Sequence, residues 1–161
     1  MTQVIVALDV DTIKREEDLL RQLKDAIVWY KVGLRLFTAH GKRAVDLVRR
    51  HGGNIFLDLK LHDIPSTVRG AATSAAAMGV ALLTVHGYGG APMVQAAVEG
   101  AGSATGILVV TVLTSHEEND MADLGLPRDI GAQVERLAQL AQNCRLDGVV
   151  CSPREVERLR Q

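Results

Sequence analysis

The sequence has no apolar run long enough to cross a membrane. Its longest apolar stretches, such as residues 106–113, are far shorter than the ~20 residues of a membrane-spanning helix. The first nine residues also lack the basic start and the cleavage site of a secretory signal. We therefore expect no association with a membrane and predict a cytoplasmic protein.

Cysteine is rare and neither sign of charge is in excess. Cys144 and Cys151 have neither the spacing of metal ligands nor a neighbouring histidine. We predict two reduced thiols, no disulfide and no metal site. The formal net charge is only -1, with 18 Lys and Arg against 19 Asp and Glu. Nucleic acid and anionic membrane surfaces are therefore not expected partners.

The hydrophobic residues are arranged in a repeating pattern of short and long segments. Short runs rich in β-branched residues alternate with longer amphipathic segments, which is typical of βα units. The predicted strands are residues 4–8, 27–32, 54–59, 82–86, 106–113 and 148–151. The predicted helices are residues 12–24, 34–51, 65–78, 91–99, 132–143 and 153–161. Strands that are almost wholly apolar predict a parallel sheet covered by helices.

Polar side chains stand at or just after the carboxyl ends of the predicted strands. They are Asp9, Lys31, Asp58, Lys60, His86 and Thr114. In a barrel these ends converge on one rim. A doubly wound sheet is the alternative, but it typically has a glycine-rich phosphate turn after the first strand, where this chain has residues 9–11, Asp-Val-Asp. We therefore predict the α/β class and a (β/α)8 TIM barrel.

The number of units is smaller than a full barrel requires. A barrel of eight units usually needs ~200 residues or more, and this chain has 161 residues in six recognisable units. The prediction is a single barrel domain over residues 1–161, incomplete at its C-terminus. We expect the chain to be part of a longer protein rather than a truncated product.

The strongest chemical signal lies at residues 57–65, which read LDLKLHDIP. Residues two apart on a strand share a face, so Asp58 and Lys60 are expected to project together into one pocket. The alternative is a surface pair, with Asp63 capping the following helix. Asp9 and Lys31 favour the first interpretation because separate strands bring opposite charges to the same rim. Such an array can face an anionic substrate and supply a proton without a metal.

The string DLKLHDIPST at residues 58–67 resembles the signature of the orotidine 5'-phosphate decarboxylases. The resemblance continues in order along the chain, through residues 6–9, 31–33, 84–86, 110–115 and 150–153. It implies a cofactor-independent decarboxylase that converts orotidine 5'-phosphate to uridine 5'-phosphate and carbon dioxide in pyrimidine biosynthesis. The implied partner is thus a small nucleotide, and no metal or organic cofactor is implied.

The resemblance also implies roles for single residues. Lys60 matches the proton donor to C6 of the pyrimidine, and Asp58 matches the carboxylate set against the substrate carboxylate. Lys31 matches a second lysine, which contacts the ribose and orders the charged network. Asp9 matches a ligand of the ribose hydroxyls. Thr114 matches a residue that hydrogen-bonds the pyrimidine ring.

A homodimer is implied by the same motif. Asp63 completes the charged network, and in the family it reaches the active site of the neighbouring subunit together with Ile64 and Thr67. The loop and the arginine that grip the substrate phosphate come, in the family, from two further βα units. No residue among 1–161 is assigned that function.

Two other functions are left open by the sequence. One is a magnesium-dependent decarboxylase of keto-sugar phosphates, which shares the Asp-x-Lys-x-x-Asp arrangement; Ile64 and Pro65 disfavour it because small residues usually follow that group's last aspartate. The other is a catalytically inactive truncated barrel.

Three further features are given structural interpretations. We interpret His86 as a packing or rim residue and His62 as a structural residue that points away from Lys60. We interpret residues 87–90 as a turn rather than a phosphate cradle.

Overall fold

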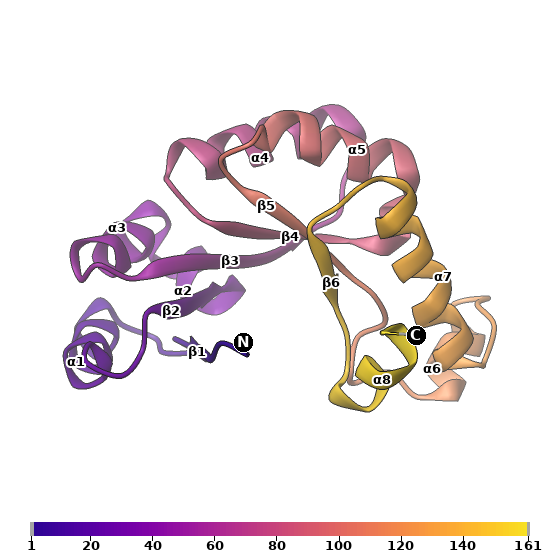
Figure 1. Cartoon of the computed structure of the whole chain (residues 1–161), viewed down its shortest axis with the longest axis horizontal. Coiled ribbons are helices and arrows are strands. Elements are labelled where there is room, and N and C mark those ends of the chain that lie inside the picture. Colours follow the sequence, from indigo (N-terminus) through magenta and orange to yellow (C-terminus); the bar gives the residue numbers. More distant parts are fainter. Residues whose placement is uncertain (1, 161) are drawn as a thin grey trace.

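The chain folds into a curled parallel sheet whose convex side is covered by helices (Figure 1). This computed structural model describes residues 2–160. The strands are β1 (Ile5–Ala7), β2 (Trp29–Gly33), β3 (Asn54–Leu61), β4 (Leu82–His86), β5 (Gly106–Val110) and β6 (Gly148–Val150). They lie in chain order, and each pairs in parallel with the next.

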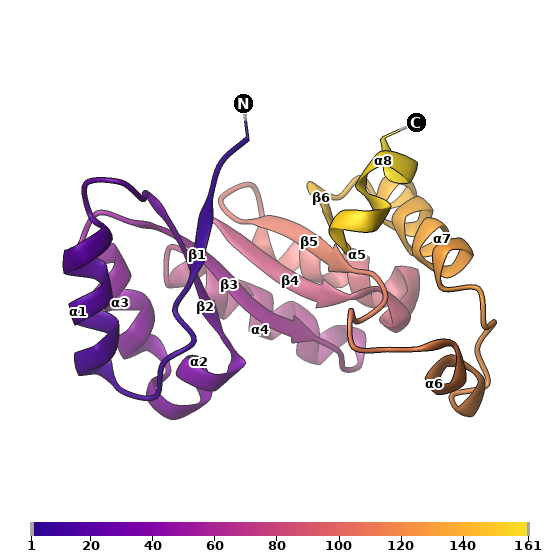
Figure 2. The same cartoon turned by 90° about the horizontal axis from the view of Figure 1, so that it is seen from below.

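The helices follow the strands in alternation. They are α1 (Ile13–Leu23), α2 (Leu34–His40), α3 (Lys42–Arg50), α4 (Pro65–Ala77), α5 (Gly90–Ala101), α6 (Glu118–Asp123), α7 (Ile130–Asn143) and α8 (Val156–Leu159). Two short 3-10 helices, η1 (Gly87–Gly89) and η2 (Pro153–Glu155), precede α5 and α8. This order and curvature confirm the predicted α/β barrel class with six βα units. Figure 2 shows the strands from the concave side, with both termini along the same edge of the molecule.

The core lies between the sheet and its helices. Leu57, Leu83 and Ile107, from three neighbouring strands, are at most 1% exposed and pack against residues such as Val68 of α4 and Val94 of α5. Burying one such aliphatic side chain contributes about 1.5–3 kcal/mol. Burial therefore holds the strands in register, and their carboxyl ends come together at one rim.

Most helix boundaries follow local signals in the sequence. The Thr12 side chain accepts a hydrogen bond from the Arg15 N–H and caps α1. Pro65 stands in the first turn of α4, and Gly79 follows that helix with a φ of 75°. Ser152 and Glu155 form a capping box at η2. The predicted helix boundaries at residues 12, 65, 78 and 153 lie at or beside these positions.

The predicted helix over residues 34–51 is wrong as a single element. Gly41 has a φ of 54° and a ψ of -138°, a conformation that L side chains rarely adopt, and it divides the segment into α2 and α3. The structure also ends the fifth strand at Val110 rather than residue 113, and it forms α6 in a segment expected to be a loop. These differences shift boundaries and leave the order of units unchanged.

Candidate active site

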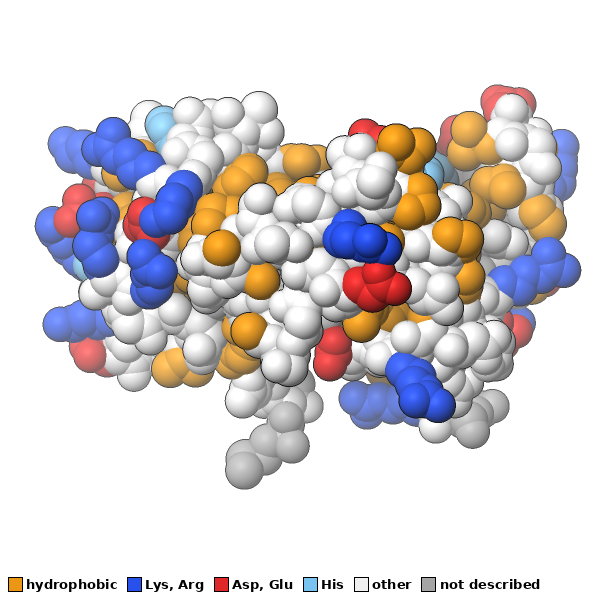
Figure 3. Space-filling view, turned by 90° about the horizontal axis from the view of Figure 1, so that it is seen from above, with side chains coloured by type: hydrophobic (Ala, Val, Ile, Leu, Met, Phe, Trp, Pro, Cys, Tyr) orange, Lys and Arg blue, Asp and Glu red, His pale blue; other side chains and the backbone are white. Residues whose placement is uncertain are grey.

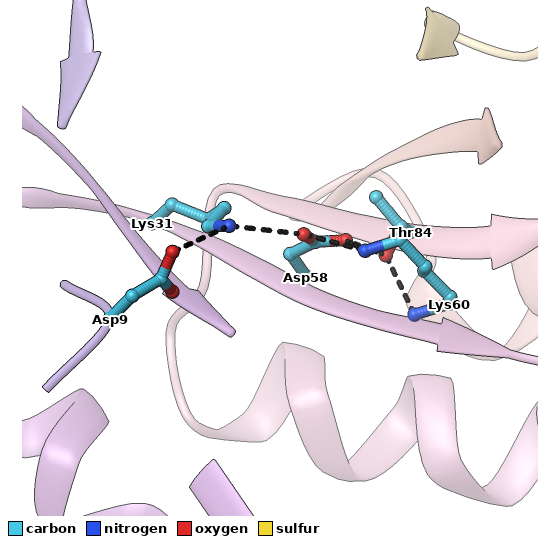
Figure 4. Close-up of polar contacts among 5 residues, drawn as sticks. All are labelled: Asp9, Lys31, Asp58, Lys60 and Thr84. Carbon is cyan, nitrogen blue, oxygen red and sulfur yellow. Dashed lines mark hydrogen bonds and ion pairs between the residues drawn. The ribbon is translucent and has the colours of Figure 1, made fainter. Parts of the chain in front are cut away.

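Five polar side chains gather along the carboxyl ends of four neighbouring strands (Figure 4). Asp9 follows β1, Lys31 lies in β2, Asp58 and Lys60 lie in β3, and Thr84 lies in β4. The parallel register brings them together, since Ala7 pairs with Lys31 and Gly33 pairs with Asp58. Sequence segments more than 70 residues apart therefore supply one cluster.

The four charged groups alternate in sign. The Lys31 Nζ lies 3.6 Å from an Asp9 oxygen and 3.5 Å from Asp58 Oδ2. The Lys60 Nζ donates to both oxygens of Asp58 at 2.8 Å. We call Asp9, Lys31, Asp58 and Lys60 the charged cluster. The predicted convergence of these four side chains at one rim of the sheet is thus seen in the structure.

Asp58 is the centre of the charged cluster and its most buried member. The residue is only 8% exposed, yet its carboxylate has three different partners: Lys31, Lys60 and the Thr84 hydroxyl. Burying a carboxylate costs free energy unless opposite charges and hydrogen bonds replace its water. The cluster provides both, and the lysines remain partly open to solvent. It can thus hold an anionic group against fixed positive charge.

The backbone at Lys60 departs from the regular strand that the sequence predicted. Its φ is 48°, and the register between β3 and β4 shifts between Leu57 and Leu61. A left-handed conformation at a residue other than glycine costs of order 1 kcal/mol or more and is concentrated at functional sites. Asp58 and Lys60 therefore meet through an irregularity of β3 and not through simple strand alternation.

Thr84 is a site residue that sequence reasoning did not select. Its hydroxyl accepts a hydrogen bond from the Lys60 N–H at 2.8 Å and donates one to Asp58 Oδ1 at 3.0 Å. The residue is 0% exposed. The available signal was a hydroxyl in the middle of the apolar run 82–85, because a buried polar group requires partners.

Gly33 is a second neighbour of the charged cluster that was not singled out. A Cβ at this position would lie 3.4 Å from Asp9 Oδ1 and 3.7 Å from the Lys31 Nζ. The missing side chain therefore leaves unfilled space directly beside the Asp9 and Lys31 pair.

The match to known proteins covers nearly the whole chain. The family model described as "Orotidine 5'-phosphate decarboxylase / HUMPS family" matches residues 2–161. The orotidine 5'-phosphate decarboxylase of Anaeromyxobacter sp. (strain K) is 50% identical over 98% of this chain, and the chain covers 70% of that protein. The orotidine 5'-phosphate decarboxylase of Geobacter metallireducens is 42% identical over 99% of this chain, and the chain covers 69% of that protein.

The chain belongs to this family.

A solved structure agrees with the sequence matches. Orotidine 5'-phosphate decarboxylase from Lactobacillus acidophilus superposes with a TM-score of 0.90 at 37% identity, covering 99% of this chain and 75% of the other. The expected family and the expected enzyme class, a decarboxylase, are therefore confirmed. The barrel fold is shared with this relative.

The family motif continues past Lys60 into an exposed loop that does not touch the charged cluster. Asp63 Oδ1 accepts a hydrogen bond from the Ile64 N–H at 2.6 Å, and within residues 2–160 Asp63 forms no hydrogen bond or ion pair with Asp58 or Lys60. Ile64 is 64% exposed, and Thr67 is exposed in the first turn of α4. Three of the predicted site residues are thus exposed and lie outside the charged cluster.

Thr114 lies apart from the charged cluster as well. It is exposed after β5, and it lines a shallow hollow with His116, Ser152 and Arg154. That hollow lies on the same rim, beyond the end of β5 and next to the start of η2. The structure therefore places Thr114 at the periphery of the candidate site.

Three aromatic rings stack beside Lys60. The rings of His62 and His86 are 5.5 Å apart, and those of His86 and Tyr88 are 5.2 Å apart. His62 thus stacks on His86 at the end of β4, beyond the irregular stretch of β3. Burial lowers the pKa of His86, with smaller contributions from His62, His116 and Lys60. The His86 ring is thus held neutral, and its Nδ1 accepts from the Tyr88 N–H at 3.4 Å.

The predicted turn at residues 87–90 forms η1 and the start of α5. A Cβ at Gly87 would lie 3.0 Å from side-chain atoms of Leu137 and Val109. The space above this turn is thus filled by α7 and β5, which agrees with a packing turn.

Cys144 and Cys151 are both free thiols. Among residues 2–160, no three His, Cys, Asp or Glu side chains converge in a way that could hold a metal ion. The helices within the same residues include none long and apolar enough to span a membrane.

Proposed function

We propose that this protein is an orotidine 5'-phosphate decarboxylase, which converts orotidine 5'-phosphate to uridine 5'-phosphate and carbon dioxide in de novo pyrimidine biosynthesis. The observation that carries the proposal is the paired Asp58 and Lys60, whose charged groups are 2.8 Å apart at the rim of a half-barrel. Of the relatives described above, the orotidine 5'-phosphate decarboxylase of Anaeromyxobacter sp. (strain K) is 50% identical to the chain. We further propose that residues 1–161 form one domain and act in the cytoplasm.

The proposed chemistry depends on fixed charge. When the bond between C6 and the carboxylate breaks, its electron pair stays on C6 and carbon dioxide leaves. The Lys60 Nζ then gives one proton to C6, and water restores that proton to the amine. An ammonium near C6 favours the carbanion-like transition state over the bound carboxylate, because the charge becomes localised beside it. No organic cofactor or metal is required in this proposal.

Asp58 and Lys31 have complementary functions in the proposal. The Asp58 carboxylate holds the Lys60 Nζ in place and faces the carboxylate that leaves. Lys31, ion-paired with both Asp58 and Asp9, orders the charged cluster and contacts the ribose. Asp9 binds the ribose hydroxyls, and Thr114 hydrogen-bonds the pyrimidine ring from the periphery. Remote contacts of this kind supply binding energy that orients the reacting carbon.

A homodimer is part of the proposal. Asp63, Ile64 and Thr67 are exposed and lie outside the charged cluster. We assign them to the active site of a partner subunit, where Asp63 would extend the alternation of charges. The outer surface supports association, because charged side chains are few over α4 and α5 and gather at the end formed by α1 and α3 (Figure 3).

Decarboxylation of orotidine 5'-phosphate by the purified protein tests the proposal. Carbon dioxide release is measured before and after extensive treatment with a chelator, with added magnesium as a third condition. We expect the rate to be the same in all three. A strict requirement for magnesium, or activity only on a keto-sugar phosphate, would sink the proposal.

Ligand binding separates an enzyme from an inactive barrel. Calorimetry with 6-aza-uridine monophosphate is expected to give saturable binding in the complete protein as encoded. Absence of binding together with absence of turnover would support the inactive alternative.

A further inference from the structure

Thr84 makes two hydrogen bonds whose direction the chemistry determines. The Lys60 N–H can only donate, so the Thr84 Oγ1 accepts that bond at 2.8 Å. The Asp58 carboxylate has no proton to give when ionised, so the same Oγ1 donates its single proton to Asp58 Oδ1 at 3.0 Å. The hydroxyl therefore joins the backbone of one reactive residue to the side chain of the other, as Figure 4 shows.

The position of these bonds explains why a hydroxyl is needed there. The regular pairing of β3 with β4 is interrupted between Leu57 and Leu61, and Lys60 lies within the interruption. Its backbone has a φ of 48°, so the N–H cannot be satisfied as in an ordinary ladder. The Thr84 side chain replaces the missing strand acceptor. With an exposure of 0%, it does this without exchange with bulk water.

We propose that Thr84 is a positioning residue for the decarboxylation, setting the Lys60 Nζ and the Asp58 carboxylate in their productive relation. It is too buried to touch the substrate, so it acts through these two residues. This inference rests on the proposed function for its kinetic test. A shift of about 1 Å in a reacting group lowers a rate by about 100-fold, so loss of this support appears in kcat.

Substitution by valine isolates the hydroxyl, because valine keeps the shape of threonine and removes both hydrogen bonds. We expect Thr84→Val to lower kcat by about 10- to 100-fold with KM changed less than about three-fold. Thr84→Ser retains the hydroxyl and is expected to recover most of the lost kcat. Thr105→Val is the matched control, since Thr105 is also buried and donates one hydrogen bond, to the Val80 carbonyl, away from the site. It is expected to lose stability and keep kcat.

Crystal structures of Thr84→Val and Thr84→Ser provide a readout that needs no substrate. In the valine variant, Lys60 is expected to leave its left-handed conformation and its Nζ to move from the 2.8 Å contact with Asp58. The serine variant is expected to keep both. If the unsubstituted protein proves inactive, the proposed function fails, and these structures still decide whether Thr84 positions the pair.

Three results would overturn the inference. They are a native kcat in Thr84→Val, a kcat loss equal to that of Thr105→Val, and an unchanged Lys60 backbone in the valine variant. A kcat loss that serine does not recover would likewise assign Thr84 to packing alone. If Thr84→Val does not fold, Thr84→Ala removes the same two bonds without adding volume and is judged by the same criteria.

Discussion

Two regions of the molecule each bury a carboxylate, one with hydrogen-bonding and charged partners and one without hydrogen-bond partners among residues 2–160. In the charged cluster, Asp58 is 8% exposed and has two lysines and a hydroxyl as partners. In the helix layer, Glu16 of α1 is 0% exposed, and neither carboxylate oxygen has a hydrogen-bond partner among residues 2–160. Burial raises the pKa of Glu16 to about 7, with Arg50 opposing the shift.

The difference teaches how burial and function are related here. A buried carboxylate without partners is destabilised as an ion, so its pKa rises. With a pKa of about 7, Glu16 is mostly neutral below that pH and supplies no fixed negative charge there. Asp58 differs from Glu16 in its partners, because two ammonium groups and a hydroxyl replace the water around its carboxylate. Burial alone therefore does not mark the site; partnered burial at the strand ends does.

The largest expected effect comes from removing the reactive ammonium. Lys60→Ala should abolish measurable turnover, a loss of at least about 1000-fold, while the fold is kept because Lys31 and Thr84 still pair with Asp58. Steady-state kinetics measures the loss, and circular dichroism and size-exclusion chromatography check the fold. Lys42→Ala is the control, since Lys42 pairs with Asp46 on the surface of α3. A near-native rate in Lys60→Ala refutes the assignment of the proton donor.

Neutralising the unpartnered carboxylate should change stability rather than catalysis. The pKa of Glu16 is about 7 in the folded chain and 4.5 as the reference value. The folded state therefore holds the proton more tightly, and the free energy of unfolding falls as pH rises from about 4.5 to about 7. The full difference is of order 3 kcal/mol. Glu16→Gln should remove this loss and be more stable than the native chain at pH 8.

Urea unfolding at pH 4.5 and pH 8 measures the effect of Glu16→Gln. The stability gain over the native protein should be largest at pH 8 and close to zero at pH 4.5. Glu17→Gln is the matched control, because Glu17 lies on the same helix and pairs with Arg21 at the surface. An equal gain at both pH values would show that Glu16 does not titrate between them.

A smaller effect is expected from adding one methyl group beside the cluster. In Gly33→Ala the new Cβ would be in van der Waals contact with the pair, 3.4 Å from Asp9 Oδ1 and 3.7 Å from the Lys31 Nζ, and would take space that water or a ligand could occupy beside the two charges. Because these residues are proposed to bind the ribose, KM should rise by about five-fold with little change in kcat, a cost of about 1 kcal/mol. A fall in kcat with unchanged KM would instead place Gly33 in support of the reacting pair.

Much of the fold could be predicted from the sequence because helices and strands are indicated by local patterns of residues. The alternating apolar runs predicted the six strands in order, and Thr12, Pro65, Gly79 and Ser152 marked helix ends that the structure contains. Gly41 was also visible, but a glycine inside an amphipathic segment is compatible with a continuous helix. Its φ of 54° is a conformation that glycine permits but does not require, so the sequence leaves it open.

Only part of the candidate site could be predicted from the sequence. Asp9, Lys31, Asp58 and Lys60 were predicted to converge because strand ends of a parallel barrel meet at one rim. Thr84 was missed, since a single threonine in an apolar strand gives no indication of which groups it will face. Glu16 had a signal that went unused: it stands three residues after Ile13 and four before Leu20, on the apolar face of α1.

By itself the sequence determined the family, the order of βα units and the identity of the charged groups, since these depend on residue type and on spacing along the chain. The tertiary structure alone decided the left-handed turn at Lys60, the Thr84 hydroxyl between Lys60 and Asp58, and the unpartnered burial of Glu16. Each of these results from contacts between segments far apart in sequence. Hydrogen bonding and burial are determined by which neighbours the folded chain brings together, and no local pattern encodes those neighbours.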